Sequence, residues 1–520
     1  MDKPRLLVTT IVAALLASVA ISAAAPGSPT VATDKGAIRG LAIEGMEVFR
    51  GIPYAAPPVG DLRWRPPKEP ARWTSVLDAT QFANHCPQNP SPYGISSLTE
   101  DCLYLNVFTS PKTNHGRPHL LPVMVWIHGG GLFLGESDGY DPSRLVAEDT
   151  VVVTINYRLG ALGVLAHPAL TAESSYGGSG NYGLMDQQAA LRWVQRNIRA
   201  FGGDPDNITI FGESAGGYSV HAQLASPQAA GLFHKAIVES GAYSLTQSSL
   251  AAAETQGIAF ATAAGCADIA CLRALSVAAI VQAGPRSTVF ANIDGFVLTQ
   301  SMQAALTNGQ FNRVPTIVGS NHDEWRLFVA QTEKATGTPL TPAGYPGAIA
   351  ALGIPAALVP FLANVAYPLA AYGSPSEALG ALGTDLVFAC NAAKSARLLS
   401  QYVSTFHYEF ADAQAAMLYF SPPISFPTGA YHASEIHYLF VLSQTPVPFP
   451  GFTPAQQQLS ETMVRYWTQF AKTGDPSEPG APAWPQYGPS HQFQSLTPPT
   501  PTTGTGAGFL GEHKCSIWGS

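Results

Sequence analysis

The sequence predicts an α/β fold in which helices flank a large, mostly parallel sheet. Segments typical of strands alternate with segments typical of helices along most of the chain, which is the order expected of a doubly wound sheet. Residues 123–127 are almost wholly apolar, as expected for a strand buried on both faces. Residues 207–211 form a β-branched and aromatic run that leads through a glycine-rich turn into a helical stretch at 217–224.

The expected strands are short and spread along the chain. Residues 38–43 and 47–49 are expected at the edge of the sheet. The clearest helix covers residues 185–200, whose apolar side chains come close to a helical stripe before Gly202 and Gly203 end it. The other expected strands are residues 103–108, 123–127, 151–157, 207–211, 236–239, 315–319 and 406–410.

Two alanine-rich regions, residues 245–290 and 327–382, are expected to be helical and to lie between sheet strands like a cap. Residues 496–510 are rich in Pro, Thr and Gly and are expected to form a loose segment near the C-terminus. The length of 520 residues allows two or three domains, or a single elaborated core.

The charge balance bears on two classes of partner. Only 12% of the residues are charged, against roughly a quarter in typical domains, and the formal net charge is −8. A weakly acidic chain without basic clusters favours neither nucleic acid nor an anionic membrane surface as partner.

Residues 1–25 are predicted to be a signal peptide. A basic start is followed by an apolar run at 6–21 and by small residues at 22–25, with cleavage expected near Ala24 or Ala25. A membrane anchor is the alternative, but the run is short for a span and the small-residue site follows at once. We therefore expect export to the periplasm or the medium, without stable membrane insertion.

The six cysteines are an even number, which suits an oxidising compartment. The sequence alone leaves their pairing open. A zinc site is disfavoured because the chain has no C-x-x-C pair and no Cys/His cluster with zinc spacing. The cysteines are Cys86, Cys102, Cys266, Cys271, Cys390 and Cys515.

The turn Gly212-Glu-Ser-Ala-Gly216 has the strand–turn–helix context of the nucleophile elbow G-x-S-x-G. Ser214 would then stand at a helix N-terminus, where backbone N–H groups favour developing negative charge. The alternative is a plain strand–helix turn. His128-Gly-Gly-Gly131 follows the buried strand directly, and its amides could stabilise an oxyanion, although a glycine loop can also be merely flexible.

A serine nucleophile needs a base, and the base needs an orienting acid. Asp323 and Glu324 follow an apolar strand and are candidates for the acid, unless both are simply solvated loop carboxylates. His432, in a loop bounded by Gly429, ranks first as the base. The competing histidines are His407 in a strand-like run and His491 and His513 near the C-terminus.

Several ordered segments together resemble the type-B carboxylesterase and cholinesterase family of α/β-hydrolases. The resemblance runs from about Gly36 to the C-terminus. The segments that carry it are Phe49-Arg-Gly-Ile-Pro-Tyr-Ala55, Glu100-Asp-Cys-Leu-Tyr-Leu-Asn106, Asn156-Tyr-Arg-Leu-Gly160, Gly180-Asn-Tyr-Gly-Leu-Met-Asp-Gln187, Phe201-Gly-Gly-Asp-Pro205 and Phe211-Gly-Glu-Ser-Ala-Gly-Gly217.

The resemblance implies roles for individual residues. The family's nucleophile falls on Ser214, its acid on Glu324 and its base on His432. It also implies an α/β-hydrolase fold, with residues 26–520 as one catalytic domain and helix-rich insertions at about 245–400 covering the active site. The implied oxyanion donors are the backbone N–H groups of Gly130, Gly131 and Ala215, and the implied disulfides are Cys86–Cys102, Cys266–Cys271 and Cys390–Cys515.

The sequence also departs from the family. Ala433 and Trp325 stand where the family commonly has Gly after its base and acid, and Tyr218 stands where a small residue is usual. The loop from Cys86 to Cys102 contains Tyr93 but no Trp to stack on a choline cation, so a choline-ester specialist is disfavoured.

These expectations describe an exported serine carboxylesterase that hydrolyses small-molecule esters without a metal or cofactor. A lipase, an amidase or a toxin-detoxifying esterase would use the same machinery. A non-enzymatic adhesion protein is disfavoured, because such relatives typically lack the nucleophile.

Overall fold

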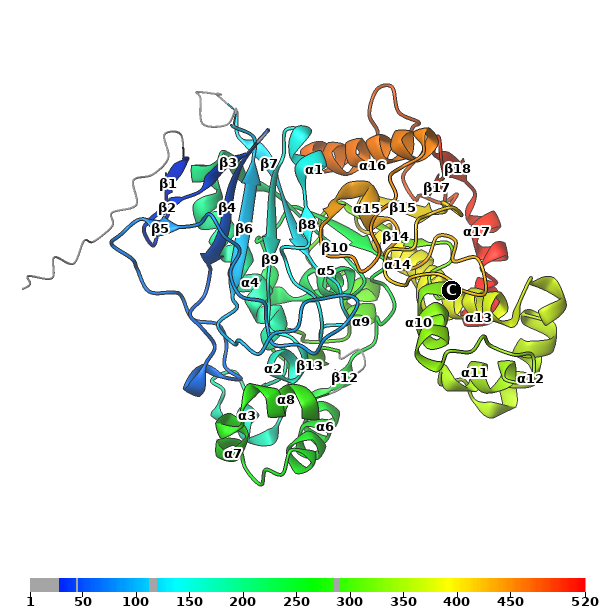
Figure 1. Cartoon of the computed structure of the whole chain (residues 1–520), viewed down its shortest axis with the longest axis horizontal. Helices are drawn as coiled ribbons and strands as arrows, with labels where there is room; N and C mark the ends of the chain where they lie inside the picture. The colour runs from blue at the N-terminus through cyan, green and yellow to red at the C-terminus, as the bar shows by residue number, and fades with distance from the viewer. Residues whose placement is uncertain (1–27, 44, 112–118, 285–289, 520) are drawn as a thin grey trace, which may run out of the picture.

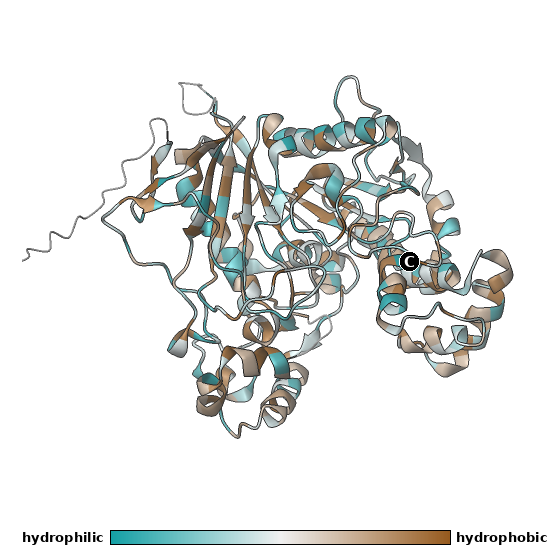
Figure 2. Cartoon of the chain, in the orientation of Figure 1, coloured by the Kyte–Doolittle hydropathy of each residue, from teal (hydrophilic) through white to brown (hydrophobic). Residues whose placement is uncertain are grey.

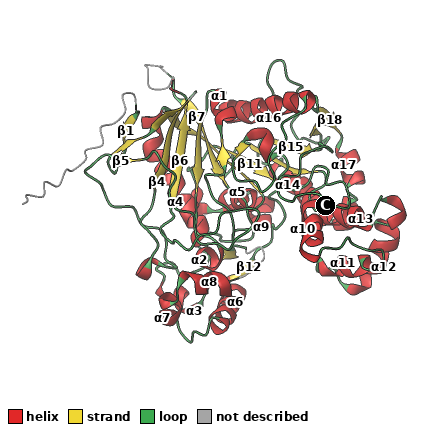
Figure 3. Ribbon diagram, viewed as in Figure 1, coloured by secondary structure: helices red, strands yellow, loops and turns green. Residues whose placement is uncertain are grey.

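The computed structural model describes residues 28–43, 45–111, 119–284 and 290–519. The predicted signal peptide, residues 1–25, lies outside the described residues. A twisted sheet occupies the centre of the molecule and helices surround it (Figures 1 and 3).

The central sheet has 11 strands and is mixed. Its middle part, from β9 to β17, is parallel, and both edges are antiparallel. In spatial order the strands are β18 (Thr502–Gly504), β17 (Phe493–Leu496), β15 (Thr405–Phe410), β14 (Thr316–Asn321), β11 (Lys235–Glu239), β10 (Gly203–Glu213), β7 (Leu121–Ile127), β9 (Val151–Ile155), β6 (Tyr104–Thr109), β4 (Met46–Pro53) and β3 (Leu41–Ile43).

Strand β7 shows why the parallel strands are apolar throughout. Val123 and Val125 belong to the core on one face of the sheet, whereas Met124 and Trp126 belong to the core on the other face. Since side chains alternate between the faces of a strand, a strand covered on both sides must be apolar at every position. In Figure 2 these central strands are accordingly largely brown.

Helices cover both faces of the sheet. Helices α4 (Tyr182–Asn197) and α5 (Ala215–Ala225) pack into the first core, and α16 (Pro454–Thr473) packs into the second. Helix α16 begins with a capping box between Thr453 and Gln456 and ends at Gly474 in the left-handed conformation. Further helices are α1 (Ser143–Ala147), α2 (Gly160–Val164), α3 (Pro168–Glu173), α9 (Met302–Asn308), α14 (Cys390–Leu399), α15 (Ile436–Leu439), α17 (Gly506–Glu512) and α18 (Cys515–Trp518).

Two further groups of helices project from the body of the molecule (Figure 1). One group, drawn in green at the bottom, contains α6 (Leu250–Ala263), α7 (Ile269–Ala274) and α8 (Val277–Ala283). The other has its own apolar cluster, and its last helix continues into η8 (Thr384–Ala389), a π-helix. Its helices are α10 (Arg326–Thr336), α11 (Tyr345–Ala351), α12 (Val359–Phe361) and α13 (Pro375–Gly383).

Most predicted elements are present among the described residues, with bounds that differ by a few residues. The strand predicted at 38–43 is instead two strands: β2 (Ala37–Arg39) belongs to a small separate sheet, and only β3 lies at the edge of the central sheet. The strand before the elbow begins at Gly203 instead of residue 207, and the helix predicted at 185–200 begins at Tyr182. The expectation of a loose segment at 496–510 is wrong. Strand β18 pairs with β17 there, and α17 follows with Thr505 as its N-cap.

Outside the main sheet, short strands form three small sheets. They are β1 (Thr30–Ala32), β2 (Ala37–Arg39) and β5 (Leu77–Asp78); β12 (Ser248–Ser249) and β13 (Asn292–Ile293); and β8 (Tyr140–Asp141) and β16 (Val441–Leu442).

Three disulfides connect the cysteines in the pairing that the family resemblance implies. They are Cys86–Cys102, Cys266–Cys271 and Cys390–Cys515, and the last joins residues 125 positions apart. Within the described residues, no helix combines the length and apolar character needed to cross a bilayer.

Candidate active site

Ser214 occupies a strained turn between β10 and α5. Its φ of 55° and ψ of −119° lie outside the regions that a serine readily adopts. The surrounding structure holds this conformation, because the Ser214 N–H donates to Glu239 O at 2.9 Å and Ser214 O accepts from Tyr218 N–H at 2.8 Å. A Cβ at Gly216 would collide with the carbonyl oxygen of Ile127, so this position requires glycine.

The turn presents Ser214 to a cavity of about 600 Å³. From Ile208 to Ser226 every residue is buried except Ser214, which is half-buried. Ser214 and His432 both line the cavity, and aromatic rings form much of its wall, among them Tyr243, Phe328 and Phe388.

His432 and Glu324 form a buried pair. His432 Nδ1 lies 2.6 Å from Glu324 Oε2, and the other carboxylate oxygen accepts from Asn321 N–H at 2.8 Å. Glu324 is fully buried and His432 is 5% exposed. A carboxylate held in this way fixes both the orientation and the tautomer of the imidazole. Nδ1–H donates to Glu324, and Nε2 carries no proton.

Asp323, the other candidate for the acid, points elsewhere. It forms an ion pair with Arg326 at 2.9 Å and accepts a hydrogen bond from Ala430 N–H at 3.0 Å. Asp323 N–H in turn donates to Ala430 O, and His432 N–H donates to Glu324 O. Asp323 therefore joins the loop after β14 to the loop that carries His432, and it does not contact the imidazole.

The structure does not place Ser214 in hydrogen-bond contact with His432. Within the described chain, the Ser214 side chain interacts with the Tyr243 hydroxyl, and His432 Nε2 lies 3.2 Å from Glu213 Oε1. Catalytic hydrogen bonds are often long in a free enzyme and shorten when substrate binds, so this geometry is compatible with His432 acting on Ser214.

The glycine loop after β7 packs directly against the elbow. A Cβ at Gly129 would approach Ser214 Cβ to 3.2 Å, and both Gly130 and Gly131 have positive φ. In the described part of the chain, no acceptor takes a hydrogen bond from the N–H of Gly130 or Gly131. Unpaired amides at the wall of a cavity are what a developing oxyanion requires.

His128 anchors this loop. Its ring stacks on Tyr157 with centroids 4.4 Å apart, and the Tyr157 hydroxyl donates to His128 O at 2.7 Å. Burial lowers the pKa of His128 to about 4, so the ring is neutral at physiological pH. The first residue of the His-Gly-Gly-Gly segment thus supports the loop without lining the cavity.

Sequence reasoning missed three buried carboxyl groups near Glu324. Burial raises the pKa of Glu213 and of Glu435 well above the usual range, and nearby carboxylates raise both further. Burial also raises the pKa of Glu239 to about 8, although Trp467 Nε1–H donates to this carboxyl at 2.7 Å. The signal for Glu213 was present, since it is the second residue of the elbow motif.

The other predicted residues lie in different surroundings. His407 is buried in β15, where burial lowers its pKa to about 3, and it does not line the cavity. Tyr218 is buried, and its hydroxyl accepts from Ala291 N–H at 3.0 Å. Tyr93, from the Cys86–Cys102 loop, lines the cavity, and so does Trp325, which lies outside this loop. Elements outside the loop therefore add to its single aromatic side chain.

The described residues contain no group of three or more His, Cys, Asp or Glu side chains placed to hold a metal ion.

The strand order, the turn after β10 and the placement of the histidine after β15 are those of an α/β-hydrolase. The sequence matches the carboxylesterase family over residues 27–518, and the chain belongs to that family. It is a carboxylic-ester hydrolase.

Curated relatives are similar over nearly the whole chain. An acylcarnitine hydrolase of Mus musculus is 34% identical, over 90% of this chain and 87% of the relative. A cocaine esterase of Homo sapiens is 33% identical, over 94% and 91%. A para-nitrobenzyl esterase of Bacillus subtilis is 36% identical, over 88% and 92%.

Proposed function

We propose that this chain is an exported serine esterase that hydrolyses small carboxylic esters through Ser214, His432 and Glu324. The observation that carries the proposal is the buried His432–Glu324 pair, which lies at the same cavity as a serine held in a strained turn. Membership of the carboxylesterase family supports ester hydrolysis.

In this reaction Ser214 Oγ attacks the ester carbonyl while His432 Nε2 accepts the serine proton. Glu324 stabilises the imidazolium that forms. The N–H groups of Gly130, Gly131 and Ala215 donate to the oxyanion of the tetrahedral intermediate, a contribution of roughly 3–4 kcal/mol for each donor. His432 then protonates the leaving alcohol, and water hydrolyses the acyl-enzyme by the same sequence of steps.

The proposal extends to organisation and location. Residues 26–520 act as one catalytic domain, with part of the cover over the cavity supplied by Phe290, Phe328 and Phe388, which lie within the helix-rich region 245–400. The N-terminal pattern at 1–25 and three disulfides support export. A lipase, an amidase or a toxin-detoxifying esterase remains an alternative that leaving-group and acyl-chain profiles would separate.

A fluorophosphonate probe tests the nucleophile directly. We expect one label per folded chain, carried by the tryptic peptide that contains Ser214, and loss of ester hydrolysis in proportion to labelling. Heat-unfolded protein serves as the control and should take up no label. Labelling of another serine with equal loss of activity would contradict the assignment.

A second prediction follows from the charges around the cavity. Among the described residues that line it, the carboxyl and imidazole side chains are Glu136, Glu213 and His432, and none is Lys or Arg. Burial raises the pKa of Glu136 to about 7, so this group is mostly ionised at pH 8. A substrate carboxylate would lose hydration there without gaining a cation.

An aryl hydrogen succinate should therefore have a kcat/KM at least about tenfold below that of the aryl pentanoate with the same phenol at pH 8, equivalent to about 1.4 kcal/mol. The difference should narrow at pH 6, where Glu136 is mostly protonated and the succinate is still ionised. Glu136→Gln should narrow the difference in kcat/KM at pH 8 and change it little at pH 6, where Glu136 is already mostly protonated. Equal kcat/KM for the two esters at pH 8 would refute the electrostatic reading of the cavity.

A further inference from the structure

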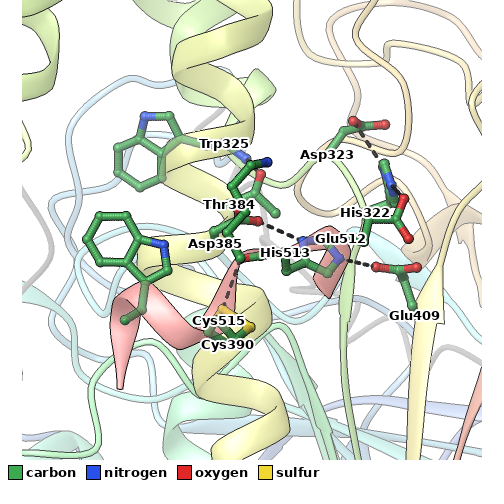
Figure 4. Close-up of polar contacts among 12 residues, drawn as sticks. His322, Asp323, Trp325, Thr384, Asp385, Cys390, Glu409, Glu512, His513 and Cys515 are labelled. Atoms are coloured by element: carbon green, nitrogen blue, oxygen red, sulfur yellow. Dashed lines mark hydrogen bonds and ion pairs between the residues drawn. A yellow bond between two sulfur atoms is a disulfide. The ribbon is translucent and has the colours of Figure 1, made fainter. Parts of the chain in front are cut away.

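Near the C-terminus, the buried side chain of His513 lies between two carboxylates. Its Nδ1 is 2.7 Å from Asp385 Oδ1 and its Nε2 is 2.6 Å from Glu409 Oε1 (Figure 4). When both acceptors are ionised, both ring nitrogens must donate, and the ring is then an imidazolium. His513 is 3% exposed, so water contributes little to this arrangement.

His322 repeats the pattern beside it. Its Nδ1 lies 3.2 Å from Asp323 Oδ1 and its Nε2 lies 2.9 Å from Glu512 Oε1. The two imidazole rings have centroids 5.6 Å apart and meet edge to face. Glu512 and His513 are adjacent in sequence, at the end of α17, so one short segment supplies a partner to each pair.

The contacts of His322 lead to the loops that hold the proposed acid and base. Asp323 directly precedes Glu324, and its second oxygen accepts from the N–H of Ala430, two residues before His432. His322 N–H also donates to Phe410 O at the end of β15. A shift of His322 would therefore be transmitted to both loops through Asp323.

The contacts of His513 lead to η8, the π-helix against which His432 packs. Asp385 belongs to η8, in which Thr384 Oγ1 accepts from Trp325 N–H at 3.0 Å. Phe388, one turn further along η8, has its ring centroid 4.8 Å from that of His432. His513 thus holds the π-helix that presents Phe388 to the proposed base.

A covalent link reinforces this second contact. Cys515, two residues after His513, is bonded to Cys390, the first residue of α14 after η8. Cys390 Sγ also lies 3.3 Å from His513 O. The ionic and covalent ties therefore hold the same two segments together (Figure 4).

We propose that His322 and His513 are positioning residues, whose imidazolium bridges clamp the C-terminal segment 506–518 onto the two elements that orient Glu324 and His432. The proposal rests on the proposed function, in which these two residues are the acid and the base. In this view the C-terminal segment maintains the geometry of the active site although it contributes no residue to the cavity wall.

The clamp should weaken at alkaline pH. Burial by itself lowers the pKa of His513, but the hydrogen bonds to Asp385 and Glu409 outweigh it and raise the pKa to about 9. Because the folded pKa exceeds the ordinary value of about 6.5, the stabilisation is complete below pH 6.5 and is lost as the pH rises through 9. His322 shows the same sign, with its pKa raised to about 11, but its side chain is 34% exposed and solvent screens its pairing.

Other charged groups face the two rings from neighbouring elements. Arg326 on α10 pairs with Asp323, and Lys514 lies over the ring of Tyr367 at 4.7 Å. His407 in β15 also faces His513, whose positive charge lowers the pKa of His407 further after burial, to about 3. Because the pKa is raised to about 9 in His513 and to about 11 in His322, His513 is the group expected to set the loss of kcat near pH 9.

The test compares His513→Gln with His119→Gln, an exposed histidine that belongs to neither pair. We expect His513→Gln to lower kcat per fluorophosphonate-titratable site about ten- to a hundredfold, because a displacement of about 1 Å at a catalytic group costs on that order. KM should change less than twofold. The wild type should lose kcat as the pH rises through 9, and His513→Gln should lack this limb while His119→Gln keeps it.

Several outcomes would overturn the clamp. A folded His513→Gln with wild-type kcat per titrated site and an unchanged alkaline limb would do so, even with a lower Tm, since that result indicates stability alone. If His513→Gln does not fold, Glu512→Gln tests the clamp instead. We then expect kcat to fall about threefold at unchanged KM, and an unchanged kcat would overturn the clamp. Failure of the proposed function is a separate result, since Ser214→Ala would then retain turnover.

Discussion

Replacing Ser214 with alanine is expected to lower kcat for a neutral aryl ester by about 10⁴-fold or more while leaving the fold intact. Without Oγ no acyl-enzyme forms, and only the oxyanion donors and substrate binding still accelerate hydrolysis. Alanine also retains the Ser214 N–H that donates to Glu239 O, so the elbow keeps its backbone hydrogen bond. Steady-state kinetics with circular dichroism as a check on folding measure both parts.

The matched control is Ser248→Ala, an exposed serine in β12, which should stay within twofold of wild type. His432→Ala should cost about as much as Ser214→Ala. Adding Ser214→Ala to it should cost little more, because residues of a triad act as a unit. Near-native turnover in folded Ser214→Ala would remove the serine mechanism, and additive losses in the double variant would separate the serine from the histidine.

Replacing Glu324 with glutamine is the second change with a large expected effect, again about 10⁴-fold in kcat. The amide presents a donor where His432 Nδ1–H needs an acceptor, so the imidazole is no longer held in the tautomer that leaves Nε2 free. The substitution also removes the negative charge that stabilises the imidazolium. The shape of the side chain is kept, and Oε1 of the amide can still accept from Asn321 N–H.

Asp323→Asn is the matched comparison, because it makes the same chemical change one residue away. Its effect should be at least about tenfold smaller, since Asp323 bonds to Arg326 and Ala430 and not to the imidazole. KM should remain near the wild-type value in both variants. A larger loss in Asp323→Asn than in Glu324→Gln would show that the wrong carboxylate has been assigned.

The two predictions rest on unequal amounts of sequence information. The elbow could be anticipated because its requirements are local: an apolar strand, glycines where chains approach closely, and a following helix. The structure has β10, the strained Ser214 and α5 in that order. The glycine loop after β7 was equally readable, since its amides depend on the conformation of adjacent residues alone.

The proposed acid and the proposed base could not be separated from their competitors in this way. Asp323 and Glu324 are adjacent carboxylates in one turn, and which of them meets an imidazole depends on the path of a loop more than 100 residues later. His432 was one of 13 histidines; its loop bounded by Gly429 ranked it first, and only the family resemblance assigned it as the base. The long-range hydrogen bonds from Asp323 and His432 set their register, and no periodicity in the sequence reports such contacts.

The C-terminal region shows most clearly that the sequence does not report contacts between distant residues. Its Pro, Thr and Gly content predicted a loose segment at 496–510, yet β18 extends the sheet there and α17 delivers Glu512 and His513 to the ends of two strands. Composition describes how readily a segment orders by itself. Here tertiary contacts and the Cys390–Cys515 bond offset the entropy of ordering it.

The sequence by itself therefore determined the alternation of strands and helices, the apolar strands buried on both faces and the local geometry around Ser214, because each depends on residues close together in the chain. Only the tertiary structure decided which carboxylate faces His432, which rings line the cavity and where the C-terminal segment lies. Those features arise from contacts between residues that are far apart in sequence, and their energies depend on burial and charge that exist only after the chain has folded.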